Sequence, residues 1–151
     1  MKRAFSLLLV LVLCLAFVPL REARAETTID KISCGIANPR HEDRPGYNPY
    51  IWSGSHCHSD DVNSTYFKND VKWIGPNGNI VAEGEETFVY GEEYDVVIYV
   101  TADDGYVFSE SLTTATLNGD SVEFDLISDT YAKLYGHFVA EPIYIWCLIR
   151  K

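Results

Sequence analysis

The segment Tyr94-Asp-Val-Val-Ile-Tyr-Val-Thr101 alternates with a period of two, and every second residue from Tyr94 to Val100 is apolar. Successive side chains of a β-strand point to opposite faces, so this pattern predicts a strand with one buried face. Ile32, Cys34 and Ile36 alternate with more polar neighbours in the same way, and residues 134–138 do so less cleanly. No segment shows a sustained apolar pattern at helical spacing. The chain is therefore expected to be all-β.

Turn signals separate the predicted strands at short intervals. Asn118-Gly119 lies between residues 114–117 and 120–124, which is a strong hairpin signature because both turn residues need a positive φ. Gly75-Pro-Asn-Gly78 and Ala102-Asp-Asp-Gly105 mark further turns. Many short strands joined by such turns favour an antiparallel β-sandwich.

The N-terminal residues read as an export signal. Lys2 and Arg3 precede an apolar run over residues 4–20, and Ala23-Arg24-Ala25 then offers a cleavage site. We expect residues 1–25 to be a cleaved signal peptide and residues 26–151 to be one secreted, extracellular domain. The alternative is an uncleaved membrane anchor, for which the run is short, since a span needs about 20 residues. After cleavage we expect no stable membrane insertion.

The charge balance excludes one class of partner. The whole chain has a net charge of −10. The predicted signal peptide holds four basic residues and one acidic residue, so its removal leaves 8 basic and 21 acidic side chains, a net charge of −13. Such a protein repels phosphate backbones, and we expect no nucleic-acid binding. An acidic surface also keeps a secreted domain soluble.

Three cysteines follow the predicted signal peptide, namely Cys34, Cys57 and Cys147. An oxidising compartment favours one disulfide and one odd thiol, and the sequence leaves three possible pairings. Cys34–Cys57 closes the shorter loop, whereas Cys34–Cys147 would join the first strand to the last.

Three stretches occur in a characteristic order: Trp73-Ile-Gly-Pro-Asn-Gly78, then Tyr94 to Phe108, then Ala115-Thr-Leu-Asn-Gly119. This ordered set resembles the Ig-like β-sandwich modules of bacterial, mainly Gram-positive, secreted and cell-wall surface proteins. Those modules combine an early Trp, a Tyr-x-Val-x-Val-x-Leu strand, an Ala-x-x-Gly-Tyr-x-Phe turn and a Val-Asn-Gly hairpin. The resemblance covers residues 29–142 and implies an Ig-like antiparallel β-sandwich with an adhesive or spacer role.

The chain departs from the family pattern in an irregular insert around residues 38–61, which carries aromatic and histidine residues. Tyr47, Tyr50, Trp52 and Tyr66 cluster around this insert. Exposed aromatic rings stack on sugars and anchor protein interfaces, so these four are binding candidates. The alternative is that they pack the insert against the sandwich.

The insert also contains His56-Cys57-His58. On a strand His56 and His58 would project to one side, where they could share zinc or copper, with Asp60, Asp61, His41 or Glu42 as further ligands. The spacing matches no established zinc signature. A disulfide at Cys57 with solvated histidines is the competing interpretation.

No nucleophile elbow or phosphate-binding loop is present, so we assign no catalytic residues and no cofactor. We therefore expect a non-enzymatic binding or structural module that acts at the cell surface on an extracellular protein or glycan. The alternatives are a carbohydrate-binding module that uses the insert aromatics, and a small secreted metal-dependent enzyme.

Overall fold

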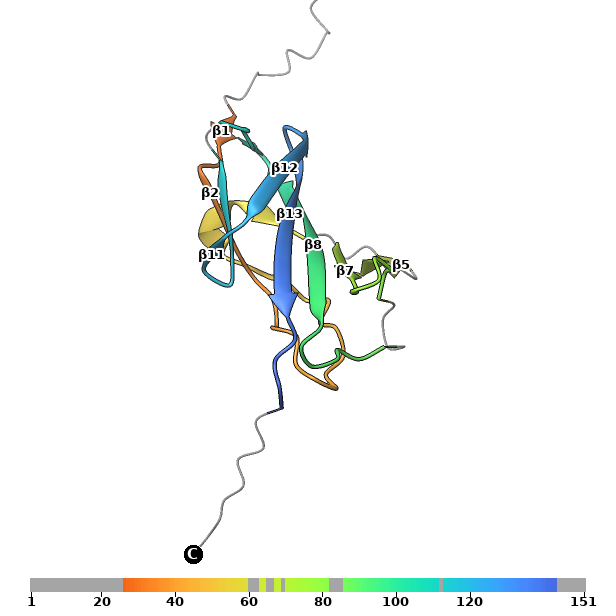
Figure 1. The fold of residues 1–151 in the computed structure, drawn as a ribbon. Coiled ribbons are helices and arrows are strands. Elements are labelled where there is room, and N and C mark those ends of the chain that lie inside the picture. The colour runs from red at the N-terminus through yellow and green to blue at the C-terminus, as the bar shows by residue number, and fades with distance from the viewer. Residues whose placement is uncertain are drawn as a thin grey trace, which may run out of the picture.

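The computed structural model describes residues 26–59, 63–64, 67–68, 70–81, 86–111 and 113–143. The predicted signal peptide, residues 1–25, lies outside the described residues, as do Tyr66, Cys147, Asp60 and Asp61. The described part of the chain consists of several open β-sheets (Figure 1). The predicted all-β class is therefore confirmed.

The strands are mostly short. In chain order they are β1 (Thr27–Thr28), β2 (Lys31–Gly35), β3 (Tyr50–Ile51), β4 (Cys57–His58), β5 (Asn63–Ser64), β6 (Phe67–Lys68), β7 (Val71–Ile74), β8 (Glu93–Ala102), β9 (Tyr106–Val107), β10 (Thr114–Leu117), β11 (Asp120–Ser121), β12 (Glu123–Ser128) and β13 (Tyr131–Val139). A single 3-10 turn, η1 (Ser53–Ser55), accompanies them in the described residues. We find no helix in this part of the chain with the length and apolar character that a membrane crossing requires.

Two large sheets carry most of these strands. One has the order β11-β10-β2-β3, and the other has the order β12-β13-β8-β7-β6-β5, with β4 also pairing with β8. β2 and β10 run parallel, whereas β8 pairs antiparallel with both β13 and β7. In Figure 1, β8 and β13 are the two long neighbouring strands in the middle of the molecule. A separate pair, β1 and β9, runs parallel.

The two large sheets contribute to one hydrophobic core. On β8 the predicted inner residues Val96, Ile98 and Val100 are fully buried, which confirms the face expected from the alternation. Ile32 of β2 and Trp73 of β7 are also fully buried and belong to the same cluster. Burying an aliphatic or aromatic side chain of this size contributes about 1.5–3 kcal/mol, so this shared cluster is what holds the sheets together.

Gly136 of β13 marks a close approach between the sheets. A Cβ atom at this position would overlap Leu117 Cδ2 of β10 and lie 2.9 Å from Val96 Cγ1 of β8. Leu117 comes from the four-stranded sheet and fills the space that a side chain at Gly136 would need. Only glycine leaves room for this contact.

The Asn118-Gly119 turn forms as predicted. Leu117 pairs with Asp120 across it, and both turn residues have a positive φ, 53° for Asn118 and 96° for Gly119. The strand expected over residues 120–124 is divided, however. The chain leaves the four-stranded sheet after Ser121 and enters the seven-stranded sheet as β12.

The expected irregular insert is more regular than its composition indicated, because residues 50–58 contribute β3, η1 and β4. Two polar contacts, one part-buried and one buried, attach the earlier part of the insert. Trp73 Nε1 donates a hydrogen bond to the carbonyl of Gly46 at 2.8 Å. Tyr47 donates its hydroxyl to the carbonyl of Val81 at 2.7 Å. The insert is thus anchored to β7 and to the loop that follows it.

Candidate functional site

The structure separates the four aromatic binding candidates. Tyr50 and Trp52 are both 62% exposed. Tyr47 is 5% exposed, so its ring belongs to the core and does not face solvent. Tyr66 lies outside the described residues. Of the rings that can be placed, Tyr50 and Trp52 come together at the surface, and Tyr47 packs the insert instead.

Local pairing holds the exposed rings in place. Tyr50 and Ile51 form β3, and Ile51 packs against the core while its two neighbours face outward. The backbone N–H of Trp52 donates to the carbonyl of Ser33 at 2.9 Å. The two rings meet edge to face, with centroids 5.6 Å apart and an interplanar angle of 83°. They form a corner and not a flat stack.

A groove of about 460 Å³ lies beside this corner. Its floor is the outer face of β2 and β10, and the Asn118-Gly119 turn lies at one end. The lining residues are Lys31, Ser33, Cys34, Gly35, Tyr50, Trp52, Thr116, Asn118 and Gly119. The volume is within the range of small-ligand sites, about 300–1,000 Å³.

The polar groups of the groove differ in how firmly they are bonded. Asn118 accepts a hydrogen bond from the N–H of Ile36 at 2.8 Å and donates to its carbonyl at 2.9 Å, so its amide is occupied with the fold. The hydroxyl of Thr116 makes two long contacts of 3.4 Å, to Ser33 Oγ and to the carbonyl of Ile32. Such long bonds are weak. The hydroxyls of Ser33 and Thr116 are therefore the groups that a ligand can engage.

The charge of the groove contrasts with that of the chain. Among the described residues that line it, Lys31 is the charged one, and none carries a carboxylate. The whole chain has 22 acidic residues and a net charge of −10. The groove is thus a nearly neutral, hydroxyl-lined surface on an acidic protein.

The two metal-ligand candidates have separate neighbours. His56 adopts a left-handed conformation, with φ of 49°. Its ring stacks on Tyr106 with centroids 4.1 Å apart. His58 Nδ1 lies 2.8 Å from Asp103 Oδ1. Within the described residues, no group of three or more His, Cys, Asp or Glu side chains is placed to hold a metal ion.

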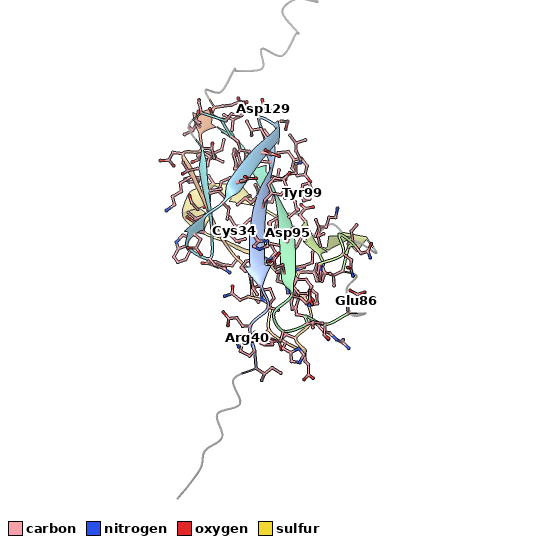
Figure 2. All side chains as sticks on the ribbon, in the orientation of Figure 1. Cys34, Arg40, Glu86, Asp95, Tyr99 and Asp129 are labelled. Atoms are coloured by element: carbon pink, nitrogen blue, oxygen red, sulfur yellow. The ribbon has the colours of Figure 1, made fainter. Side chains whose placement is uncertain are left out.

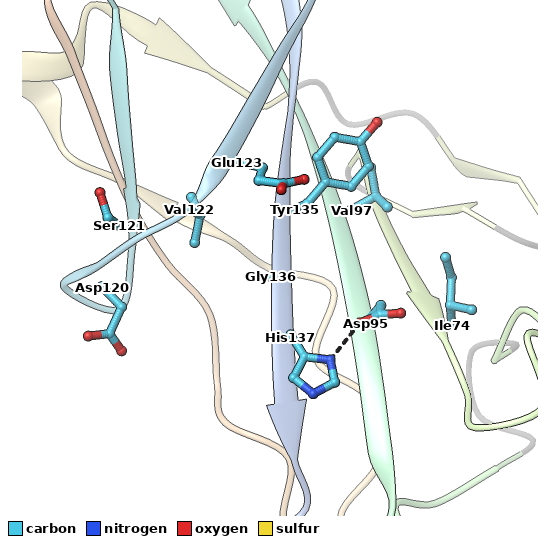
Figure 3. Close-up of a pocket in the computed structure, with 10 residues that line it drawn as sticks. All are labelled: Ile74, Asp95, Val97, Asp120, Ser121, Val122, Glu123, Tyr135, Gly136 and His137. Atoms are coloured by element: carbon cyan, nitrogen blue, oxygen red, sulfur yellow. Dashed lines mark hydrogen bonds and ion pairs between the residues drawn. The ribbon is translucent and has the colours of Figure 1, made fainter.

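A second groove, of about 650 Å³, crosses the outer face of the seven-stranded sheet (Figure 3). It holds the carboxylates of Asp95, Asp120 and Glu123 and the imidazole of His137. His137 Nδ1 lies 2.8 Å from Asp95 Oδ1, and both side chains are 59% exposed. Figure 2 shows Asp95 and Tyr99 along β8, on this outer face.

Ser121 also lines the second groove, so serine, histidine and aspartate occur in one depression. In a serine–histidine pair, the serine is activated by a histidine within hydrogen-bond reach. His137 is bonded to Asp95, and the structure contains no bond between the described side chains of Ser121 and His137. These residues therefore do not form an assembled triad.

The two described cysteines are buried thiols. Burial raises the pKa of Cys34 to about 12. Burial also raises the pKa of Cys57 to about 12, and the charges of Asp103 and Cys34 act in the same direction. Thiols in this state are poor nucleophiles, because the thiolate is the reactive form.

Sequence reasoning missed most of the groove beside Tyr50 and Trp52. The alternation of Ile32, Cys34 and Ile36 already implied that Lys31 and Ser33 face outward. The parallel pairing of Ser33 with Thr116 was not visible, because the two residues are far apart in the chain. The Asp95–His137 pair likewise depends on the pairing of β8 with β13.

Comparisons with protein-family models, with curated proteins and with solved structures gave no match to this chain. The interpretation of its function therefore rests on the residues and their geometry.

Proposed function

We propose that this chain is a secreted, non-enzymatic binding module with an Ig-like β-sandwich fold, and that it binds a neutral glycan in the groove beside Tyr50 and Trp52. The observation that carries the proposal is the exposed aromatic corner beside a hydroxyl-lined groove. None of the described residues that line this groove carries a carboxylate. The module acts outside the cell, at the surface, as an adhesive contact.

The exposed rings favour a ligand over a purely structural role. Both side chains remain 62% exposed although each could bury a large apolar area. Tyr and Trp are enriched among the residues that dominate binding energy, because they bury area with few rotatable bonds. The edge-to-face contact leaves the two ring faces in different directions. A sugar ring can stack on one face while its substituents meet the other ring.

The polar surroundings favour an uncharged, polyhydroxyl ligand. Ser33 and Thr116 offer hydroxyls in long internal bonds, and the Lys31 ammonium is a donor. The net charge of −10 disfavours anionic polymers at long range. A hydrophobic peptide would leave these polar groups without partners, whereas a sugar can bond to them.

The fold and the N-terminal sequence support the setting of the proposal. An all-β chain with two large sheets around one core agrees with a sandwich module. The export-signal pattern of residues 1–25 supports secretion. The intact mass of the protein recovered from the medium tests this part, because cleavage after Ala25 would leave a chain that begins at Glu26.

The glycan site is tested with the exported protein, produced from the full chain. Binding is measured on an array of uncharged oligosaccharides and by affinity electrophoresis in gels that contain neutral polysaccharide. The wild type is expected to bind, and Trp52→Ala is expected to weaken binding about tenfold or more, which corresponds to about 1.4 kcal/mol. Tyr50→Ala is expected to weaken it less, because a tyrosine ring offers a smaller face.

Tyr90→Ala is the matched control, because Tyr90 is 61% exposed but does not line the groove. It should bind like the wild type. Unchanged affinity of Trp52→Ala would refute the site. A wild type that binds no uncharged glycan would refute the ligand class and leave a spacer role. Circular dichroism of each variant verifies that the fold is retained.

A further inference from the structure

Cys34 and Cys57 come from different sheets but share one core. Cys34 lies in β2 of the four-stranded sheet, and Figure 2 shows where it sits in the molecule. Cys57 begins β4, which pairs with β8 of the seven-stranded sheet. Their side chains are 6% and 7% exposed and belong to the same hydrophobic cluster. A bond between them would therefore join the two sheets through the core.

The chain that leads to Cys57 runs along β2. The N–H of Trp52 donates to the carbonyl of Ser33 at 2.9 Å, and the N–H of Ser33 donates to Ser55 Oγ at 2.9 Å. Cys57 follows Ser55 by two residues, and its Cα therefore lies within about 7 Å of that of Ser55. Ser33 precedes Cys34 directly. Cys34 is thus one residue away from the hydrogen bond that joins Ser33 to Ser55, and Cys57 is two residues away from it.

An electrostatic effect agrees with this placement. The pKa of Cys57 is raised by burial, by Asp103 and by the charge of Cys34. An interaction between two charges decreases with their separation. The influence of Cys34 on Cys57 therefore supports the proximity that the hydrogen bonds indicate.

We propose that the exported protein carries a disulfide between Cys34 and Cys57. In the reaction two S–H bonds break and one S–S bond forms, and the two protons and two electrons pass to the disulfide of an exported thiol–disulfide oxidant, which becomes a dithiol. The first cysteine forms a mixed disulfide with the oxidant, and the second displaces it. Cys147 is then the odd cysteine of the mature chain.

Burial sets the order of events. In the folded, reduced protein both thiols have a pKa of about 12. The reactive thiolate is therefore scarce at neutral pH, and both cysteines lie in the core, so exchange with an oxidant is slow. The bond therefore forms while the chain is folding, before the two sheets close over the sulfur atoms.

The disulfide also bears on the aromatic corner, and this step rests on the proposed function. Tyr50 and Trp52 lie in the loop that a Cys34–Cys57 bond would close. The bond fixes the end of the segment that carries both rings and thereby limits their freedom before a ligand arrives. Loss of the bond is expected to weaken glycan binding about 2- to 12-fold, the ordering cost of one side chain.

Peptide mapping of the wild type tests the bond without any variant. The exported protein is denatured, alkylated without reduction and digested with trypsin, which places the cysteines in separate peptides, residues 32–40, 41–68 and 134–150. We expect peptides 32–40 and 41–68 to be linked and peptide 134–150 to be alkylated. Alkylation of both Cys34 and Cys57, or a link from either to Cys147, would overturn the proposal.

Two variants separate the bond from the function. Cys147→Ser should keep the 32–40 to 41–68 link and the full glycan affinity, whereas Cys57→Ser should lose the link and lose affinity 2- to 12-fold. If the link is absent while the wild type still binds glycan, the disulfide is refuted and the proposed function stands. If the link is present and Cys57→Ser binds fully, the effect on the rings is refuted.

Discussion

Replacing Gly136 with alanine tests a close approach between the two sheets. A Cβ atom at this position would overlap Leu117 Cδ2 and would lie 2.9 Å from Val96 Cγ1 and 3.2 Å from Phe138 Cε2. Leu117 and Val96 are buried at 3% and 0% exposure, so neither can move into solvent. The new methyl group must therefore push the sheets apart or force side chains out of their preferred rotamers.

The cost follows from the packing density of the core. Overpacking of this kind destabilises a protein by about 1–3 kcal/mol. For a domain of this size, 1 kcal/mol shifts the melting temperature by about 4 °C. Gly136→Ala is thus expected to lower the melting temperature by about 4–12 °C, whereas alanine on an open strand would be harmless.

The assays are thermal unfolding, which gives the melting temperature, and urea unfolding, which gives the free energy. Both are followed by tryptophan fluorescence, since Trp73 is fully buried and reports on the core. Gly54→Ala is the matched control, because a Cβ at Gly54 would meet nothing within 4 Å. Its stability should change by no more than about 0.5 kcal/mol.

A double-mutant cycle with Leu117→Ala makes the reasoning refutable. Truncation of Leu117 costs about 2–5 kcal/mol by itself, but it removes the atom that the new methyl group would strike. Gly136→Ala should therefore cost less in the Leu117→Ala background than in the wild type. The prediction fails if Gly136→Ala is as stable as the wild type, or if the losses of unfolding free energy in the two single variants add up to the loss in the double variant. Either result would show that the two sheets do not meet at this point.

Two further predictions concern the core. Tyr47→Phe removes a buried hydroxyl that donates to the carbonyl of Val81, and we expect a loss of about 1–2 kcal/mol in the urea assay with unchanged glycan affinity; weaker glycan binding would place Tyr47 in the site. In the reduced protein, folding raises the thiol pKa of Cys34 and Cys57 from 9.0 to about 12. The unfolded state therefore loses protons first, and the stability from this shift is complete below pH 9 and is lost as the pH rises toward 12. Urea midpoints of the reduced protein between pH 8 and pH 11 should fall more steeply than those of Cys34→Ser, and equal slopes would contradict the burial of the thiol.

Local patterns predicted the elements that depend on neighbouring residues alone. The alternation in residues 94–101 identified the buried face of β8, because strand periodicity follows from backbone geometry. Val97 is the exception, at 6% exposure on the outer face. It is paired with Lys72 of β7 and with Tyr135 of β13, so it lies in the interior of the sheet. Its burial depends on pairing that no local pattern contains.

The candidate site was predictable only in part. Closeness in the sequence grouped Tyr47, Tyr50, Trp52 and Tyr66 as one aromatic cluster, of which Tyr66 lies outside the described residues. The structure separates Tyr47 from the two exposed rings. Tyr47 precedes β3 and bonds to the loop after β7, whereas Tyr50 lies in the edge strand β3, Trp52 directly follows it, and both are exposed. Nothing in the local sequence distinguishes a tyrosine that anchors an insert from one that faces solvent.

The sequence by itself determined the β-class, the buried face of β8 and the hairpin at Asn118-Gly119, since each follows from strand periodicity or turn chemistry. The tertiary structure decided which distant segments meet. The parallel pairing of β2 with β10 made the floor of the groove, and the crossing of residues 50–57 from one sheet to the other brought Cys57 into the core with Cys34. These contacts join residues far apart in the chain, and their energy depends on packing that only the complete fold provides.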